Sequence, residues 1–338
     1  MARLAEIAAH AGVSEATVSR VLNDKGNVSD ATRETVLTSV DVLGYERPSN
    51  LRRHAVGLVG IIVPELTNPV FAMFAQTLQG RFSAHDYTSV VCTQAPGGTQ
   101  EEEYLQMLQD RGVAGVVFVS GRHADTTADI AHYQRLAERG LPIVVVNGYR
   151  EEIDAPSVST NEAAAVRIAL NHLRQLGHQR IGLATGQSRY LPSMCKVAEF
   201  RAQVAEFDTD EPVIEQTWFS VEGGELAGRR LLERGVTAVI CGSDMMALGV
   251  VKAVEQQGLS VPSDVSVIGY DGWLLTQHTS PALTTVRQDL NGLSAAIVHA
   301  LTEEIAGRRH PRGDLLFDPE LVVRASTAPA RPGAAKRP

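Results

Sequence analysis

The chain has 338 residues, a hydrophobic share of 44% and a formal net charge of −8. This length is too great for one ordinary core and suits two or three domains of a soluble globular protein. Its first residues hold no long apolar run behind basic ones, so we expect neither a secretory signal nor a transmembrane helix. A cytoplasmic protein without a membrane partner is predicted.

The cysteines are odd in number and widely separated. Without close pairs they favour neither a zinc site nor a disulfide framework. Reduced, buried thiols are therefore expected at Cys92, Cys195 and Cys241.

The acidic excess lies outside the N-terminal segment. Residues 1–54 carry as many basic as acidic side chains, so this segment is neutral. Any nucleic-acid binding there has to come from side chains gathered on one face, helped by hydroxyls, backbone amides and helix N-termini, because no overall positive field attracts phosphates.

Three short helices are predicted in the first 45 residues. Gly12 is expected to end the first helix, where glycine adopts a left-handed conformation at low cost. Ser14 is placed to cap the second helix, Ser29 or Asp30 to cap the third, and Gly44 to close it. Apolar residues recur at helical spacing and predict one small core: Leu4, Ile7, Ala8, Ala11, Val18, Val21, Leu22, Val36, Val40 and Leu43.

From Val56 the pattern changes to β/α alternation. Apolar runs such as VGLVGIIVP, PIVVVNG and VSVIGYD alternate with helical stretches, which is typical of parallel strands buried on both faces. These apolar runs are more numerous than the strands of a single small sheet. We therefore predict a core over residues 56–326, made of two doubly wound α/β subdomains that divide near residues 154–159 and enclose a cleft.

The segments around this core have other compositions. Residues 47–55 contain Pro48 and a group of basic residues, and they are predicted to be a hinge or linker after a head at residues 1–46. Residues 327–338 are rich in Pro, Ala and basic residues, so disorder is expected there.

The first two helices, joined by AGVS, match a helix-turn-helix, whose second helix can enter a major groove. An ordinary three-helix cap on an α/β protein is the alternative. The string AGVSEATVSRVLND, followed by VSDATRETVLTSVDVLGY, is more specific and resembles the lactose-repressor (LacI/GalR) family. The resemblance continues through IIVPELTNPVF, NHLRQLGHQRIGL, CGSDMMALGVVKAV and VPSDVSVIGYD. It implies an all-α head on a core like the type I periplasmic binding proteins.

The resemblance also implies which residues contact DNA. It places Ser14 and Thr17 at phosphates and Glu15 and Ala16 over bases. Arg20 can bind a guanine edge with two hydrogen bonds, Glu15 can accept one from cytosine, and the Ala16 methyl can pack on thymine. Glu15 could equally complement the helix dipole. The resemblance adds Ser19, Arg20 and Asn23 on the same face, and Ser29, Thr32 and Tyr45 at phosphates.

The hinge departs from the family pattern. Family members usually carry a helix there whose leucine inserts into the minor groove, but the interval from Tyr45 to Gly60 is shorter than usual. Counting back from Gly60 selects Leu51, with Arg52 beside it as a phosphate ligand. The alternative is a solvated linker in which Leu51 packs on the core.

Polar and aromatic residues follow the predicted strands, where open α/β sheets bind ligands. Resemblance to the family's sugar pockets selects Asn68, Phe71, Asn147, Tyr190, Lys196, Phe219, Ser243 and Asp271. Carboxylates and amides bind paired hydroxyls, and aromatic rings stack on a pyranose. Lys196 stands where the family mostly has Arg, which puts bidentate recognition in doubt. Asp244 is predicted to cap the following helix.

No enzyme motif such as GxxxxGK[ST], GxSxG or HExxH is found, and the histidines show no metal spacing. We therefore expect no catalytic residue, metal or cofactor. Residues 101–103 are interpreted as a solvated acidic helix start, and His172 and His178 as structural residues.

The sequence thus predicts a homodimeric transcriptional repressor that binds a pseudo-palindromic DNA operator. A small sugar-like effector would control its affinity for the operator, and the resemblance favours a maltose or α-glucoside type. The alternative is a sugar-binding protein of a transport system, which would share the core fold but lack the head and carry an export signal.

Overall fold

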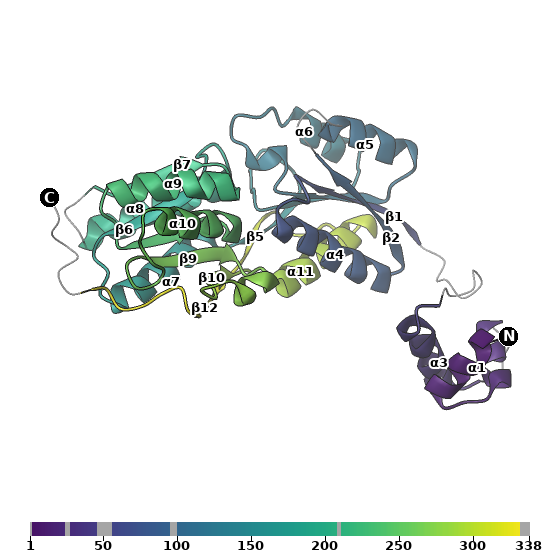
Figure 1. Cartoon of the computed structure of the whole chain (residues 1–338). Helices are drawn as coiled ribbons and strands as arrows, with labels where there is room; N and C mark the ends of the chain where they lie inside the picture. The colour runs from purple at the N-terminus through teal and green to yellow at the C-terminus, as the bar shows by residue number, and fades with distance from the viewer. Residues whose placement is uncertain (1, 24–27, 46–55, 95–99, 208–210, 332–338) are drawn as a thin grey trace. The chain divides into compact units, whose positions relative to one another are not determined.

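The computed structural model describes residues 2–23, 28–45, 56–94, 100–207 and 211–331. The chain divides into two compact units, Met1–Val56 and Gly57–Pro338 (Figure 1). No helix among these described residues is long and apolar enough to cross a bilayer.

The first unit is a three-helix head formed by α1 (Ala2–Ala11), α2 (Glu15–Leu22) and α3 (Asp30–Val42). Ser14 and Ser29 cap α2 and α3, since each hydroxyl accepts a hydrogen bond of 3.2 Å from a backbone amide three residues later. Gly12 and Gly44 have φ of +66° and +70°, which confirms the predicted helix ends. Most of the predicted core is also confirmed, with Ile7, Ala8, Val18, Val21, Val36 and Val40 buried and Leu4, Ala11 and Leu22 packed against them. Leu43 is 36% exposed, so its predicted place in this core is wrong.

The second unit contains two six-stranded sheets. The first has the order β11-β5-β4-β3-β1-β2, and all its paired neighbours are parallel. Its strands are β1 (Gly57–Val63), β2 (Tyr87–Thr93), β3 (Gly115–Val119), β4 (Ile143–Val146), β5 (Pro156–Thr160) and β11 (Gly313–Phe317). Figure 1 shows α4 (Pro69–Ala84) and α11 (Leu290–Ile305) on one face, with α5 (Glu101–Asp110) and α6 (Ala131–Glu138) on the other.

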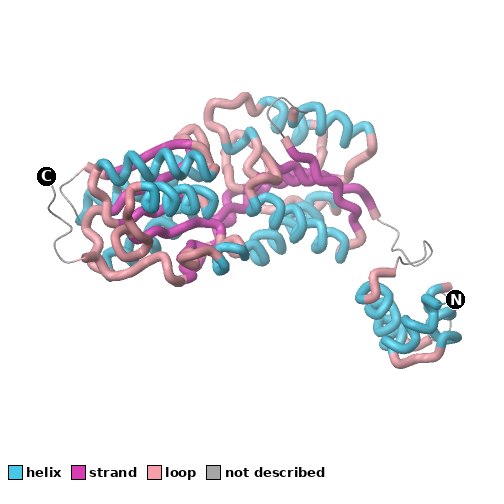
Figure 2. Tube along the Cα trace, viewed as in Figure 1, coloured by secondary structure: helices cyan, strands magenta, loops and turns pink. Residues whose placement is uncertain are grey.

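The second sheet has the order β12-β10-β9-β8-β6-β7, and only β12 among its described strands runs antiparallel. Its strands are β6 (Ile181–Gly186), β7 (Val213–Thr217), β8 (Ala238–Cys241), β9 (Ser266–Asp271), β10 (Thr284–Arg287) and β12 (Glu320–Val322). Its two faces pack on α7 (Glu162–Gln175) with α8 (Leu191–Phe207), and on α9 (Val221–Glu233) with α10 (Asp244–Gln256). Figure 2 shows strands between helical layers in both subdomains. The predicted fold class is confirmed.

The predicted division into two consecutive halves is wrong in one respect. The chain crosses to the second sheet after β5, returns to the first for α11 and β11, and crosses again before β12. The sequence pattern missed this return because β11, GDLLF, is a short edge strand with half-exposed and exposed side chains instead of a buried apolar run.

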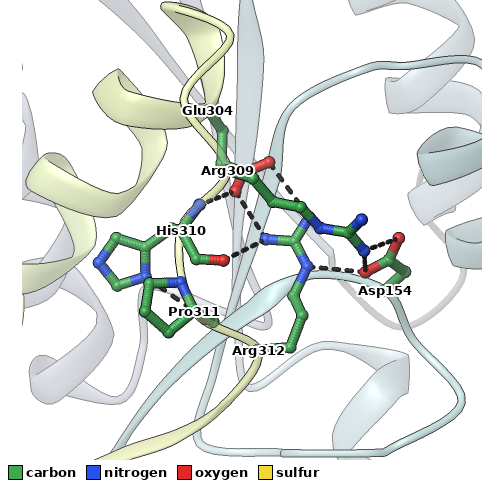
Figure 3. A network of polar contacts seen from close by, with 6 residues as sticks. All are labelled: Asp154, Glu304, Arg309, His310, Pro311 and Arg312. Atoms are coloured by element: carbon green, nitrogen blue, oxygen red, sulfur yellow. Dashed lines mark hydrogen bonds and ion pairs between the residues drawn. The ribbon is translucent and has the colours of Figure 1, made fainter.

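The segment that returns to the first sheet is held in place near residues 154–159, where the sequence predicted the division. Asp154, just before β5, accepts hydrogen bonds from Arg312 Nε (2.7 Å) and Arg309 Nη2 (2.8 Å) (Figure 3). Arg312 Nη1 also donates to Glu304 at the end of α11 (2.6 Å). Hydrogen bonding by Arg312 above all holds the pKa of Asp154 below its ordinary value. Residues 154–159 therefore belong to the first subdomain, next to the segment that comes back from the second.

The expected disorder from residue 327 is wrong for residues 327–331. Thr327 Oγ1 is hydrogen-bonded to His172 Nε2 (3.0 Å), Ala328 O to His178 Nε2 (3.0 Å), and the Ala330 amide to Leu176 O (2.8 Å). The two histidines are thus structural, as predicted, and their ring nitrogens hold this segment on the second subdomain. Residues 332–338 lie outside the described residues.

One of the predicted buried thiols is exposed. Cys92 and Cys241 are buried, whereas Cys195 lies on the surface of α8. All three are free, as expected.

Candidate effector cavity and DNA-contacting helix

A cavity of about 600 Å³ lies at the carboxyl ends of strands from both sheets of the second unit. Its lining follows β1 to β5 of the first sheet and β6 to β10 of the second. The structure brings all the predicted effector residues together here: Asn68, Phe71, Asn147, Tyr190, Lys196, Phe219, Ser243 and Asp271. This size is in the range of pockets for small organic ligands.

Two of the predicted residues begin helices at the cavity. Asn68 Oδ1 accepts a hydrogen bond from the Val70 amide (3.3 Å) and caps α4. Ser243 Oγ accepts one from the Met246 amide (3.1 Å) and caps α10. The cap of α10 is therefore Ser243, and the prediction that Asp244 caps this helix is wrong.

Aromatic side chains form the apolar part of the lining. Phe71 lies on α4, and Phe219 lies just after β7. The Phe219 ring fits closely against β6, because a Cβ at Gly186 would stand 2.1 Å from Phe219 Cε2. Glycine at this position therefore leaves room for an aromatic ring that can stack on a sugar.

Asn147 is held in a strained backbone conformation at the end of β4. Its φ of +61° is in the left-handed region, which asparagine tolerates better than most residues. Its Oδ1 accepts from the Thr160 amide (3.3 Å), and its Nδ2 donates to Ser120 Oγ (3.4 Å). Both bonds orient the amide at the cavity.

Lys196 is a buried cation with two partners. Its ammonium forms an ion pair with Glu162 and lies 3.9 Å from the centroid of the Tyr270 ring. A Lys ammonium is a compact point charge, so it satisfies Glu162 without the planar fork that Arg would offer a ligand.

Two buried carboxylates stand beside each other at the ends of β9 and α10. Asp271 accepts a hydrogen bond from Gln288 Nε2 (2.8 Å), while Asp244 accepts from Thr285 Oγ1 (2.6 Å) and the Trp273 amide (2.7 Å). Burial raises the pKa of Asp244 to about 6. Burial and the neighbouring Asp244 raise the pKa of Asp271 well above its ordinary value. The arrangement favours a proton on the pair.

The helix α2 presents one uncovered face in the head. Val18 and Val21 are buried, whereas Glu15, Ala16 and Arg20 are exposed. The other predicted DNA contacts of the described head are exposed or half-buried: Ser14, Thr17, Ser19, Asn23, Ser29, Thr32 and Tyr45. Leu51 and Arg52 lie outside the described residues, so the minor-groove wedge stays a prediction.

The chain matches two family models. Residues 3–48 match the bacterial regulatory proteins of the lacI family, and residues 170–327 match the periplasmic binding protein-like domain. A helix-turn-helix-type transcriptional regulator in the aml 5′ region of Streptomyces limosus is 52% identical over 98% of this chain and 96% of its own length. The chain belongs to the lacI family.

Other similarities agree with this assignment. The regulator MalR of Streptomyces coelicolor is 48% identical over 99% of both chains. Among solved structures, a complex of the transcriptional regulator CelR with cellobiose is 28% identical over 96% of this chain and 99% of its own, with a TM-score of 0.70. A lac repressor dimer bound to operator and the anti-inducer ONPF is 25% identical over 95% and 98%, with a TM-score of 0.71. This lacI-family protein is a DNA-binding transcriptional repressor with an effector-binding core.

Several residues that line the cavity of this lacI-family regulator escaped sequence analysis. Trp218, 63% exposed, directly follows β7, so its position at a strand end was a signal that could have found it. The sequence analysis did not select Glu162, Asp125 or Arg189, because the role of each depends on an ion pair with a residue far away in the sequence.

A buried polar cluster stands behind the first-subdomain wall of the cavity. Glu101 is fully buried and accepts hydrogen bonds from His132 Nε2 (2.7 Å), the Tyr133 hydroxyl and Gln94 Nε2 (3.0 Å). The interpretation of residues 101–103 as a solvated helix start is therefore wrong for Glu101. Burial alone would raise the pKa of Glu101, but the hydrogen bonds from His132 and Tyr133 hold it below its ordinary value. Gln94 also lines the cavity, so the cluster supports the wall.

Proposed function

We propose that the cavity binds a neutral glucose disaccharide of the maltose or α-glucoside type, and that binding changes the affinity of a homodimer for its operator. The observation that carries this proposal is the convergence of the predicted polar and aromatic residues on one cavity of about 600 Å³. Asn147, Lys196 and Asp271 offer hydrogen-bonding groups, and Phe71 and Phe219 offer apolar faces for a pyranose.

The comparisons support a disaccharide. A related regulator of the same fold was solved with cellobiose, and MalR shares 48% identity over nearly the whole chain. The cations at the cavity also favour a neutral ligand. Lys196 is paired with Glu162, Arg189 with Asp125, and Arg122 with Glu102, so their charges are already balanced.

A thermal-shift panel tests the effector class. It compares maltose, cellobiose, glucose, ribose and a sugar phosphate, each followed by operator binding in fluorescence anisotropy. A ligand at 100 times its dissociation constant adds ~2.7 kcal/mol of stability. The proposal expects stabilisation by maltose and a change in operator affinity at the same concentrations. Stabilisation by the sugar phosphate alone would contradict it.

Asp271 tests whether the cavity is the effector site. Asp271→Asn keeps the shape of the side chain but changes its hydrogen-bonding character, so ligand affinity should fall by ~1–3 kcal/mol. Operator binding without ligand should be retained. A variant that binds the ligand as tightly as the parent would contradict the assignment of Asp271 to the effector, and a lowered melting temperature would show that Asp271 serves the fold instead.

For the head, we infer that Arg20 contacts a base edge while Thr17 and Asn23 orient the helix at the backbone of the DNA. Arg20 is exposed on the uncovered face of α2, next to the half-buried Ser19. Arg20→Ala should cost ~1–3 kcal/mol and relax preference at one symmetric pair of operator positions. An equal loss for every DNA sequence would remove the base contact from the proposal.

The proposed assembly is a dimer on a pseudo-palindromic operator. A structure of the related lac repressor is a dimer bound to operator, and a twofold protein matches a pseudo-palindromic site. Sedimentation equilibrium should give a dimer at micromolar concentration. A tetramer that persists after deletion of residues 327–338 would contradict this assembly.

A further inference from the structure

Loops from the two subdomains meet directly at the cavity. Asp125 follows β3 and the short 3-10 helix Arg122–Ala124 in the first subdomain, whereas Tyr190 lies between β6 and α8 in the second. The two residues form an isolated antiparallel bridge. Next to it, the Thr126 amide and hydroxyl both donate to Arg189 O, at 2.8 Å and 2.9 Å. These bonds, all of which end on backbone groups of the second subdomain, join the two loops directly.

Charged side chains reinforce the contact. Arg189 Nη1 lies 3.3 Å from Asp125 Oδ2, and the Asp125 side chain is 14% exposed against 46% for Arg189. Both residues line the cavity together with Tyr190. We call the group Asp125, Thr126, Arg189 and Tyr190 the clasp.

Arg189 also fixes the Tyr190 ring. Its guanidinium carbon lies 4.8 Å from the ring centroid, and its Nη2 donates to the Tyr190 hydroxyl (2.8 Å). A hydroxyl that accepts from Arg189 directs its own proton elsewhere. A hydroxyl oxygen of a ligand in the cavity is a suitable acceptor for that proton.

We propose that Asp125 and Arg189 are positioning residues for the effector: they close the clasp between the subdomains and hold Tyr190 with its hydroxyl as a donor to the ligand. The clasp itself is a property of the protein alone, while the role of Tyr190 rests on the proposed function. Asp125 of the first subdomain thus orients Tyr190 of the second through Arg189. The effector contact of Tyr190 is complete only when the two loops meet.

Hydrogen exchange of the Thr126 amide tests the clasp without any ligand. Asp125→Asn removes the charge but keeps the acceptor that Thr127 uses (2.9 Å), and Arg189→Met removes the guanidinium. Each variant should speed exchange roughly threefold, as expected for a partly exposed ion pair. The double variant should add nothing further, because both changes break the same interaction. Arg308→Ala, which removes an exposed pair with Glu303 elsewhere in the core unit, is the control and should leave this amide unchanged.

The outcomes separate a clasp from an incidental contact. Unchanged exchange in the single variants, or fully additive effects in the double variant, would overturn the clasp. In that case the side chains of Asp125 and Arg189 would act independently of each other and would not hold the two loops together.

Arg189→Lys tests the positioning of Tyr190 separately. Lysine keeps a charge for Asp125 but lacks the second planar donor, so Thr126 exchange should stay slow. Maltose affinity, measured by calorimetry on the full chain, should fall roughly fivefold, the size of one hydrogen bond. Tyr190→Phe should give a similar loss, and combining the two should add little. Full maltose affinity in Arg189→Lys would overturn the positioning role. If the parent protein does not bind maltose, the proposed function fails, and the exchange cycle still decides the clasp.

Discussion

The two walls of the cavity bury carboxylates in opposite electrostatic settings. Behind the first-subdomain wall, Glu101 accepts hydrogen bonds from His132, Tyr133 and Gln94, and its pKa is lowered. In and behind the second-subdomain wall, Asp271 and the neighbouring Asp244 are buried, and both pKa values are raised. Both walls are buried, so desolvation acts on each of them. Hydrogen bonds from His132 and Tyr133 favour the ionised form of Glu101, whereas in the second wall burial, and for Asp271 also the neighbouring Asp244, favours the protonated form.

The difference assigns different tasks to the walls. A satisfied, ionised carboxylate such as Glu101 fixes its surroundings, because removing it leaves several donors without an acceptor. A carboxyl group that favours its proton and lines the cavity, such as Asp271, can offer an O–H donor to a ligand. We therefore expect the first wall to be the rigid support and the second to be the chemically responsive side.

The largest effect is expected from Glu101→Leu. Loss of the buried acceptor should destabilise the core unit by about 3–5 kcal/mol, because His132, Tyr133 and Gln94 lose their partner together. Urea unfolding measures the change. Glu102→Ala is the matched control in the same helical turn, where the half-exposed pair with Arg122 should be worth less than about 1 kcal/mol. Equal losses in the two variants would show that the cluster does not support the wall.

A smaller effect is expected in acid from His123, which is fully buried near Glu101. Burial lowers its pKa to about 4. The neutral ring is therefore favoured by folding: its contribution is complete above the ordinary pKa near 6.5 and is lost as the pH falls through 4. This amounts to about 2–3 kcal/mol.

His123→Gln should flatten this acid loss, since an amide can still donate to Val146 O as the ring does at 3.0 Å. Melting temperatures between pH 7 and pH 4 measure it. His278→Gln, at an exposed position, is the control and should keep the parent slope. If both variants retain the full slope, the acid sensitivity arises elsewhere.

The head and the first wall together show how much of the structure the sequence alone predicts. Caps at Ser14 and Ser29 and the helix end at Gly12 depend on neighbours within a few residues, so they were predicted correctly. The cavity residues were selected by the resemblance to the family's sugar pockets, together with their positions after predicted strands. Glu101 was misjudged because three consecutive acids resemble a solvated helix start, and its partners His132 and Tyr133 lie on another helix, α6.

Non-local pairings account for the other differences. The return of α11 and β11 to the first sheet has no sequence pattern of its own, since β11 is an edge strand that pairs with β5 across more than half of the core. The clasp between Asp125 and Arg189 likewise exists only after both subdomains have formed. Chain topology has to be known before such contacts can be assigned.

The second wall should respond to pH in the opposite direction. For Asp244 the folded pKa is about 6, above its ordinary value of 3.8. Its favourable contribution is therefore complete below pH 4 and is lost as the pH rises through 6. Asp244→Asn cannot ionise, so the loss of stability on going from pH 4 to pH 7 should shrink by about 2 kcal/mol. An unchanged slope would indicate that the pair with Asp271 stays ionised in the folded protein.

The smallest effect is expected from removing an arginine that pairs with Asp154, an exposed carboxylate outside both walls. Asp154 binds two arginines, but Arg309 is 70% exposed and Arg312 only 27% (Figure 3). Solvent screens the exposed pair, so Arg309→Ala should change the free energy of unfolding by less than about 0.5 kcal/mol. Arg312→Ala should cost more, about 1–2 kcal/mol, because Arg312 also donates to Glu304 at 2.6 Å and to His310 O at 3.0 Å. Urea unfolding of the two variants side by side gives the comparison. If Arg309→Ala were the more destabilising change, solvent exposure would not explain the difference between these two arginines. The solvated carboxylate Asp154 could then no longer be compared with the buried carboxylates of the two walls on the basis of exposure.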